Sequence, residues 1–159
     1  METARKVTEI LIKKNTTITF MESCTSGLLA SMFTDTEGAS AVFKGSLVTY
    51  SNEMKIFHGV SSKIIEDHGV YSSQCAEAMA ETVQKIHGSD ISIGITGTTG
   101  NPDPANRDSV RGEAFFCIRV KDENHSFRID ENVDGMSRKE IKQLYANRVY
   151  ERILEILSE

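Results

Sequence analysis

The sequence predicts an α/β protein: a three-layer α/β/α sandwich with a mixed central sheet, formed by a single domain over residues 1–159. Segments with helical spacing of apolar residues alternate along the chain with short runs rich in β-branched and aromatic residues. Such alternation indicates helices that cover both faces of a sheet. Two strand-like runs flank Asp122-Glu123-Asn124 and predict a β-hairpin, whose antiparallel strands make the sheet mixed.

Apolar spacing and composition assign the first part of the chain. A helix is expected over residues 3–14, where apolar side chains recur every three or four residues. Residues 17–21 have the branched and aromatic composition of a strand, and residues 28–33 predict the helix that follows it. After a polar loop, residues 41–50 predict a second strand, with Gly45 as a candidate bulge.

Three helices and a buried strand are predicted in the middle of the chain. Each helix begins at serines that can cap it and ends at or near a glycine, which gives approximate ranges of 51–59, 61–69 and 72–88. Residues 90–95 form a short apolar run of the kind buried in an α/β sheet.

The last third of the chain begins with the glycine-containing sequence TGTTG, followed by a polar loop over residues 101–111 that contains both prolines. Residues 112–120 and 126–133 are the two strands of the expected hairpin. A long amphipathic helix is predicted over residues 137–157.

Composition and charge exclude several classes of protein. The formal net charge of −5 argues against a nucleic-acid binder, because such domains usually carry a basic excess. No apolar run approaches the roughly 20 residues that span a bilayer. The charged start of the chain lacks the apolar centre of a signal peptide. We therefore expect a cytoplasmic protein that binds neither nucleic acid nor a membrane.

The cysteines and histidines predict no metal site. Cys24, Cys75 and Cys117 are scattered and odd in number, and they match neither a disulfide framework nor a metal-ligand spacing. The four histidines form no HxH or HxxxH pair. We expect no metal and no other cofactor, and Cys24 is either a small buried filler or, as an alternative, a nucleophile.

The stretch ESCTSG, residues 22–27, is the first candidate for chemistry. It joins a predicted strand to a predicted helix, so its side chains lie at the carboxyl edge of the sheet, beside the free N–H groups of the helix. A hydroxyl such as that of Ser23 could act there as a nucleophile, although the GxSxG pattern is absent. The alternative is an ordinary helix N-cap.

Two further junctions follow strands. The TGTTG sequence is either a plain turn or a loop whose amides approach a phosphate, and it is no Walker motif. Tyr50 and Lys55 bracket a third junction, where a lysine is usually solvated. If Lys55 were instead partly buried beside Ser23, its amine could lose its proton and serve as a general base, with the phenol of Tyr50 steering the proton.

Four segments together resemble the C-terminal domain of the CinA family: ESCTSG, GASAVFKGSLVTYSNEMK, HGVYS and the strand that ends in TG. The resemblance covers nearly the whole chain. Stand-alone members of this family include bacterial nicotinamide-nucleotide amidohydrolases. It implies hydrolysis of the carboxamide of nicotinamide mononucleotide to nicotinic acid mononucleotide and ammonia, without a metal. It also implies a small-molecule nucleotide as the binding partner and a homodimer as the common assembly.

The resemblance also implies roles for residues of this chain. Ser23 would be the nucleophile, Lys55 the base and Tyr50 an assisting phenol. Other residues would bind the substrate through backbone amides that stabilise an oxyanion, through a strand end, and through a guanidinium on the phosphate: Thr25, Ser26, Gly27, Thr96, Gly97 and Arg138.

Three departures from the family pattern keep a second hypothesis open. Ser26 replaces a glycine of ESCTGG, the glycine-rich loop is replaced by GTTGNPDPANRDSVRG, and the usual GDR reads Gly135-Met136-Ser137-Arg138. The chain could therefore be a non-catalytic nucleotide-binding or regulatory module of the competence/damage-inducible type. A third hypothesis is esterase or peptidase action by the same pair of residues.

Overall fold

The central sheet has five strands. In spatial order they are β2 (Phe43–Val48), β1 (Ile18–Glu22), β3 (Ile91–Gly97), β4 (Glu113–Val120) and β5 (Glu123–Asp130). The first three are parallel to one another, and β3, β4 and β5 form antiparallel pairs. This computed structural model describes all residues from 1 to 159. The predicted mixed sheet is confirmed.

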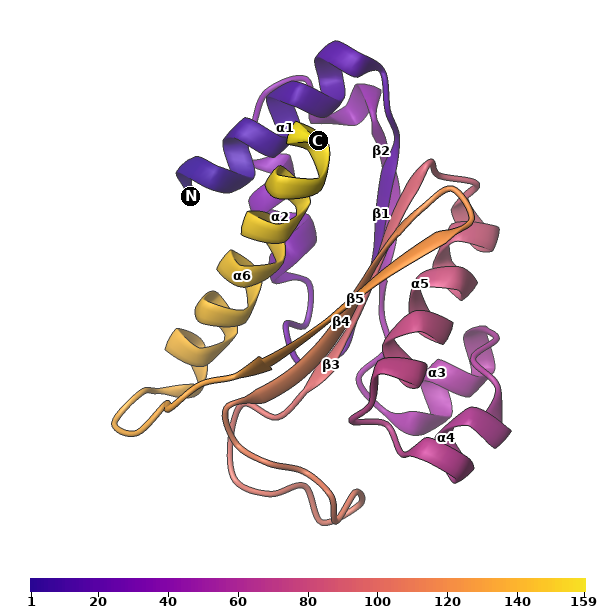
Figure 1. Cartoon of the computed structure of the whole chain (residues 1–159), viewed down its shortest axis with the longest axis vertical. Coiled ribbons are helices and arrows are strands. Elements are labelled where there is room, and N and C mark those ends of the chain that lie inside the picture. Colours follow the sequence, from indigo (N-terminus) through magenta and orange to yellow (C-terminus); the bar gives the residue numbers. More distant parts are fainter.

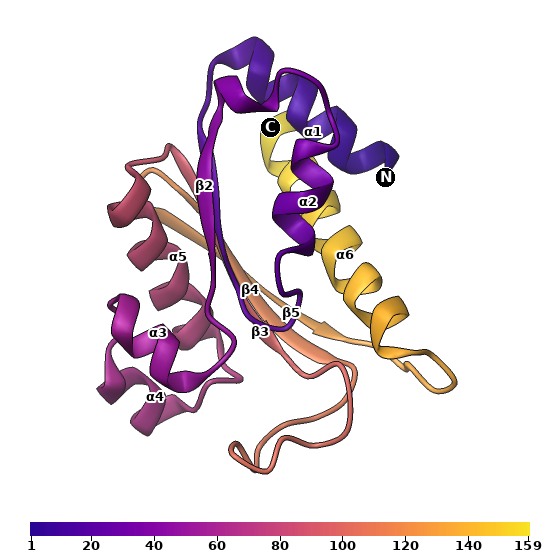
Figure 2. The same cartoon turned by 180° about the vertical axis from the view of Figure 1, so that it is seen from behind.

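Six α-helices cover the two faces of the sheet: α1 (Glu2–Lys14), α2 (Leu28–Thr34), α3 (Asn52–His58), α4 (Ser62–His68), α5 (Ser73–His87) and α6 (Arg138–Ser158). Helices α1, α2 and α6 lie on one face, and α3, α4 and α5 lie on the other (Figures 1 and 2). A short 3₁₀ helix, η1 (Ala39–Ala41), leads into β2. This arrangement confirms the predicted α/β/α sandwich.

The larger part of the core lies between the sheet and helices α1, α2 and α6. Its buried aromatic side chains are Phe20, Phe33, Phe116, Tyr145 and Tyr150. All five residues of β1 are buried, as is expected for a strand covered on both faces. On the opposite face, α5 packs closely on β3 because Gly94 has no side chain: a Cβ there would collide with the backbone of Ala76 and Ala80.

Most helices and strands lie within a few residues of their predicted bounds. Two details of the sheet bear on the remaining predictions: the bulge in β2 and the hairpin of β4 and β5. Between Phe43 and Ser46, β2 advances three residues while β1 advances two, so the predicted bulge lies around Gly45. The predicted hairpin is present, but its second strand was placed three residues too late, because the turn is only Lys121 and Asp122 and β5 runs from Glu123 to Asp130. Lys121 has a left-handed φ of 54°, which lets the chain reverse in two residues.

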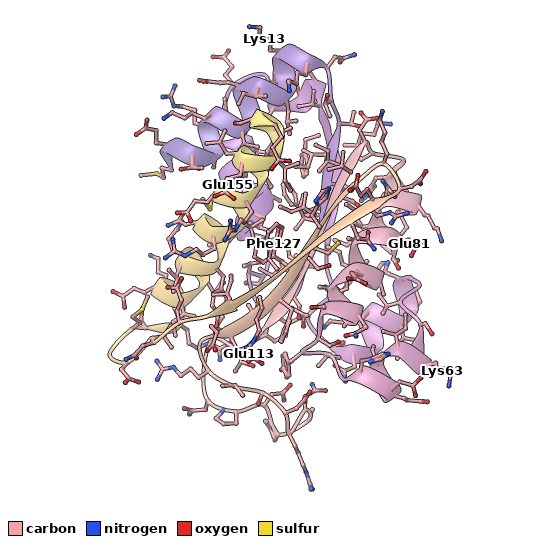
Figure 3. All side chains as sticks on the ribbon, in the orientation of Figure 1. Lys13, Lys63, Glu81, Glu113, Phe127 and Glu155 are labelled. Atoms are coloured by element: carbon pink, nitrogen blue, oxygen red, sulfur yellow. The ribbon has the colours of Figure 1, made fainter.

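Charged side chains such as Lys13, Lys63 and Glu155 are exposed on the outer faces of the helices (Figure 3). Among the helices, none combines the length and the apolar composition that crossing a membrane requires.

Candidate active site

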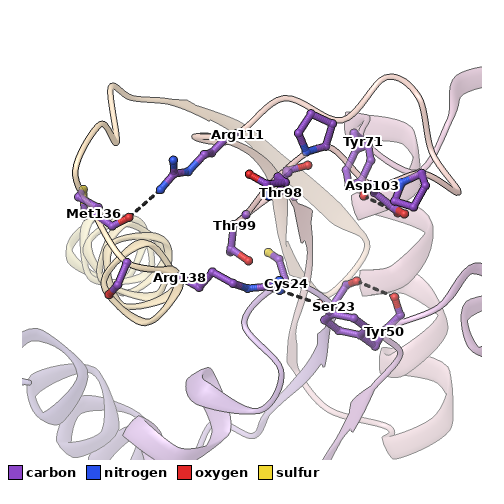
Figure 4. Close-up of a pocket in the computed structure, with 16 residues that line it drawn as sticks. Ser23, Cys24, Tyr50, Tyr71, Thr98, Thr99, Asp103, Arg111, Met136 and Arg138 are labelled. Carbon is purple, nitrogen blue, oxygen red and sulfur yellow. Dashed lines mark hydrogen bonds between the residues drawn. The ribbon is translucent and has the colours of Figure 1, made fainter.

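A cavity of about 590 Å³ opens at the carboxyl ends of the parallel strands (Figure 4). In open α/β sheets this edge is where ligands bind, because the loops that follow neighbouring strands converge there. Segments far apart in the sequence line the cavity: Ser23 and Cys24 after β1, Tyr50 after β2, Tyr71 before α5, residues 97–104 at the end of β3, Arg111 before β4, and residues 136–138 at the start of α6.

The structure brings Ser23 and Lys55 together beneath this cavity. Lys55 Nζ lies 3.1 Å from Ser23 Oγ and also donates to the carbonyl oxygen of Thr49 at 2.9 Å. Only 2% of Lys55 and 7% of Ser23 are exposed. Helix α3 directs the lysine inward, and its first turn is fixed by Ser51, whose side chain accepts a hydrogen bond from the N–H of Met54.

The surroundings of Lys55 favour its neutral form. Burial lowers the pKa of its amine, and the nearby negative charge of Asp103 only partly opposes that effect. No carboxylate forms an ion pair with Lys55 at hydrogen-bonding distance. A buried amine that loses its proton readily can accept the proton of the adjacent serine hydroxyl.

Cys24 is the neighbouring nucleophile that has to be considered. Burial, together with the nearby carboxylate of Glu22, raises the pKa of its thiol to about 12. Because the thiolate is the reactive form of cysteine, this thiol is a poor nucleophile near neutral pH. Ser23 is therefore the better-activated group at the corner.

Glu22 organises that corner, and the sequence analysis missed it. Its fully buried carboxylate accepts hydrogen bonds from the hydroxyl of Thr25 at 2.7 Å and from the N–H groups of Leu29 and Ala30 at 2.9 and 3.1 Å. A carboxylate in this position satisfies free donors at the start of α2 and complements the helix dipole. An acidic residue just before a predicted helix was the available signal.

The predicted oxyanion donors need correction. The N–H of Ser26 donates to the carbonyl oxygen of Ser23 at 3.0 Å and is therefore occupied. Ser26 Oγ is also engaged, because it accepts from Lys142 at 2.6 Å. The N–H groups of Thr25 and Gly27 take part in no backbone hydrogen bond, so they are the predicted amides that stay available. Ser26 has a left-handed φ of 48°, a conformation that favours glycine.

The strand end is only partly as predicted. Thr96 does not line the cavity: it is buried, and its hydroxyl donates to the carbonyl oxygen of Val70 at 2.9 Å. Gly97 does line the cavity, and a Cβ there would lie 2.5 Å from the Cβ of Ala114. The glycine therefore allows β3 and β4 to approach each other at the cavity floor.

Tyr50 and Arg138 meet at the mouth of the cavity. Arg138 Nη2 donates to the phenolic oxygen of Tyr50 at 2.9 Å (Figure 4). The backbone carbonyl of Tyr50, rather than its phenol, faces Ser23, with the oxygen 3.5 Å from Ser23 Oγ. In this geometry the phenol contacts a guanidinium and not the Ser23–Lys55 pair.

Sequence reasoning also missed three charged or polar residues of the lining: Arg111, Asp103 and Tyr71. Arg111 Nη2 donates to the carbonyl oxygen of Met136 at 2.6 Å, which links the loop after β3 to the start of α6. Tyr71 donates its phenolic hydrogen to Asp103 at 3.1 Å. The polar composition of residues 101–111 was the only signal for Asp103 and Arg111, whereas Tyr71 belongs to the HGVYS segment, for which the sequence indicated no role.

The chain is similar to known proteins along its whole length. The family described as "CinA C-terminal domain" matches residues 1–157. The chain is 36% identical over 157 residues to the MG115 homolog of Mycoplasma pneumoniae, covering 98% of both chains. It is 44% identical over 115 residues to a CinA-like protein of Fervidobacterium nodosum, covering 72% of this chain but only 28% of that longer protein.

Solved structures have the same fold. A CinA superfamily protein of Klebsiella pneumoniae superposes with a TM-score of 0.91 at 23% identity, covering 99% of this chain and 96% of that one. A competence/damage inducible protein of Agrobacterium tumefaciens gives a TM-score of 0.88 at 24% identity, covering 99% and 94%. At these identities the likeness concerns the fold alone.

Proposed function

This chain belongs to the CinA C-terminal domain family, and from that premise we propose that it is an amidohydrolase of nicotinamide mononucleotide or a related small amide, which works through Ser23 and Lys55. The observation that supports the proposal most directly is the distance of 3.1 Å between Ser23 Oγ and Lys55 Nζ at the floor of the cavity. A hydroxyl beside a buried amine is the minimum that nucleophilic amide hydrolysis without a metal requires.

Acylation comes first in the proposed reaction. The neutral amine of Lys55 takes the proton of Ser23 as Oγ attacks the carboxamide carbon, and a tetrahedral oxyanion forms. The amides of Thr25 and Gly27, which take part in no backbone hydrogen bond, are candidates to stabilise its charge. The Lys55 ammonium then gives its proton to the departing nitrogen, which leaves as ammonia, and an ester to Ser23 remains.

Deacylation repeats the same proton transfers with water. Lys55, neutral again, takes a proton from a water molecule that attacks the ester carbon. The ammonium then returns this proton to Ser23 Oγ as the bond to carbon breaks. The product is the carboxylic acid, nicotinic acid mononucleotide, and the chain returns to its starting state. The one group thus serves as base and acid in both halves.

We assign the substrate phosphate to the side of the cavity that is formed by Arg111 and the start of α6. Arg138 and Arg111 both line it, and the first turn of the 21-residue helix α6 begins there. Guanidinium groups bind phosphate through paired hydrogen bonds, and a helix N-terminus favours an anion. In this assignment Arg138 exchanges the phenolic oxygen of Tyr50 for a phosphate oxygen, and Tyr50 remains as a wall of the entrance.

Ammonia release from nicotinamide mononucleotide by the purified protein tests the proposal. Ser23→Ala and Lys55→Ala are each expected to lower the rate by about a thousandfold or more, because each removes one half of the pair. Lys63→Ala changes an exposed lysine of α4 and should leave the rate unchanged.

Two results would count against the proposal. Wild-type protein that releases no ammonia from any amide in a panel of nucleotides would remove the amidohydrolase hypothesis. If mononucleotides nevertheless raised the melting temperature, the non-catalytic binding module would become the better description, since a ligand that binds only the folded state stabilises it.

A further inference from the structure

The charged side chains that line the cavity fall on two sides of it. Asp103 is the one carboxylate among the lining residues, and Arg111 and Arg138 are the two cations. In Figure 4, Asp103 lies beside Tyr71, whereas Arg111 lies beside Met136 at the start of α6. We infer that Asp103 is a specificity-determining residue, which selects ligands with a positively charged ring over otherwise identical ligands with a neutral ring. This inference rests on the proposed function.

The carboxylate of Asp103 is held in place by three donors. It accepts hydrogen bonds from Asn106 Nδ2 at 2.7 Å, from the N–H of Ala105 at 2.9 Å and from the hydroxyl of Tyr71 at 3.1 Å. The bond from Asn106 has the largest effect among those that lower the pKa of Asp103. The cavity therefore contains a fixed negative charge at neutral pH.

Asp103 lies on the side of the cavity that is tied to α3, the helix that carries Lys55. Asn106, which donates to Asp103 at 2.7 Å, also accepts from Asn52 at 2.9 Å, and Asn52 is the first residue of α3. Lys55 of the same helix contacts Ser23. A ligand whose carboxamide meets Ser23 therefore places its ring in the part of the cavity that Asp103 faces.

A pyridinium mononucleotide matches this distribution of charge. Its ring nitrogen is quaternary and positive, the carboxamide is on the same ring, and the negative phosphate is at the far end of the ribose. With the phosphate at Arg111 and Arg138, the ring cation faces Asp103. The dihydropyridine form has nearly the same shape and the same phosphate, but its ring is neutral and gains no attraction from a carboxylate.

A purely structural role for Asp103 makes a different prediction. The same hydrogen bonds shape the loop over residues 101–111, which is also tied to Asn52 through Asn106. If Asp103 only shaped this loop, its replacement would disturb every ligand of the cavity alike. If the charge of Asp103 attracts the ring of the ligand, replacement of Asp103 by the isosteric amide should weaken the binding only of ligands with a cationic ring.

The test is a binding measurement by calorimetry in the Ser23→Ala background, where no ligand is consumed. The two probes are nicotinamide mononucleotide and its dihydropyridine form. Asp103→Asn is expected to weaken binding of the pyridinium ligand roughly tenfold, as for a partly solvated charge pair a few ångströms apart. Binding of the dihydropyridine ligand should stay unchanged. The ratio of the two dissociation constants is the readout.

Two further variants serve as controls. Asp108→Asn removes the same charge from the same loop, but Asp108 is exposed and does not line the cavity, so neither dissociation constant should change. Tyr71→Phe removes one anchor of the carboxylate and keeps its charge, so it should affect both ligands alike.

If Asp103→Asn weakened the binding of both ligands equally, or of neither, the inference would be overturned. Ammonia release by wild type would still support the proposed function. Absence of ammonia release, or absence of any mononucleotide binding, would overturn the proposed function and this inference with it.

Discussion

Lys55 holds an amine where water scarcely reaches, and this one side chain connects the stability of the protein with its proposed chemistry. Its amine has two oxygen partners, Ser23 Oγ and the carbonyl of Thr49, and only 2% of the residue is exposed. Burial of a cation without a paired carboxylate favours loss of the proton. The same burial therefore prepares a base and weakens the fold.

The first prediction concerns the pH dependence of the rate. Only neutral Lys55 can accept a proton, so kcat/KM should rise with pH through the lowered pKa of this amine, and the limb should be centred below the ordinary lysine value of 10.5. Measurement of kcat/KM for ammonia release from about pH 6 to about pH 11 locates this rise. A rate that does not rise with pH, or that rises only at 10.5, would contradict the role of Lys55 as base.

The second prediction concerns stability. The pKa of Lys55 is lower in the folded protein than its unfolded value of 10.5, so between these two values the unfolded chain binds more protons. The free energy of unfolding of wild type should therefore rise with pH across that window. Lys55→Met has no amine to titrate, so we expect its free energy of unfolding to exceed that of wild type. This difference should be largest below the folded pKa of Lys55 and should shrink as pH rises. Urea unfolding of both proteins at several pH values measures this difference.

Among the elements, the corner between β1 and α2 depends on an internal carboxylate. Glu22 accepts three hydrogen bonds there and has no cation bonded to it. These bonds hold the end of a strand against the start of a helix, and Ser23 is the residue between them. The position of Ser23 therefore depends on Glu22, whose side chain contacts α2 on one face of the sheet, whereas Ser23 itself contacts Lys55 of α3 on the other face.

The third prediction follows from these bonds. Glu22→Ala should lower the free energy of unfolding by about 2–4 kcal/mol, because it leaves the hydroxyl of Thr25 and two helix N–H groups unpaired in a buried place. Glu22→Gln keeps an acceptor and should cost less. Glu37→Ala, at an exposed position in the following loop, is the control, and urea denaturation is the measurement. Equal stability of the alanine variants at 22 and 37 would refute this account.

Helices and strands differ in how far they could be predicted from the sequence. Ser51 and Ser72 cap α3 and α5 as local signals indicated, because a cap is a contact between near neighbours in sequence. The start of β5 was misplaced because its first residues, Glu123, Asn124 and His125, are polar, and the alternation of apolar and polar residues begins only at Phe127. Its register is set by pairing with β4 instead.

At the scale of the whole molecule, the cavity is a product of tertiary structure. The pairing of Ser23 with Lys55 was expected because family resemblance linked two motifs that local spacing left unconnected. The positions of Asp103 and Arg111 could not be read from the sequence. The loop that holds them takes its shape from Tyr71, 32 residues before Asp103, and from Asn52, 54 residues before Asn106.

Because its lining extends from Ser23 to Arg138, the cavity exists only when nearly the whole chain is folded. Ligand binding must then stabilise the global fold rather than one local unit. This is the basis of the fourth prediction, which uses the Ser23→Ala protein so that the ligand is not hydrolysed. At a mononucleotide concentration a hundredfold above Kd, folding should gain about 2.7 kcal/mol. For a chain of this length that gain corresponds to a rise of roughly 5–10 °C in Tm.

Arg138 should be responsible for much of that rise, because its guanidinium lies at the mouth of the cavity and is assigned to the phosphate. Arg138→Ala in the Ser23→Ala background should shrink the Tm shift at the same ligand concentration. Arg152→Ala should preserve it, because Arg152 lies on the same helix but pairs with Glu155 and lines no part of the cavity. Differential scanning fluorimetry of the three proteins measures the shifts. If the two arginine variants respond equally to ligand, the phosphate is bound elsewhere and the assigned orientation of the nucleotide is wrong.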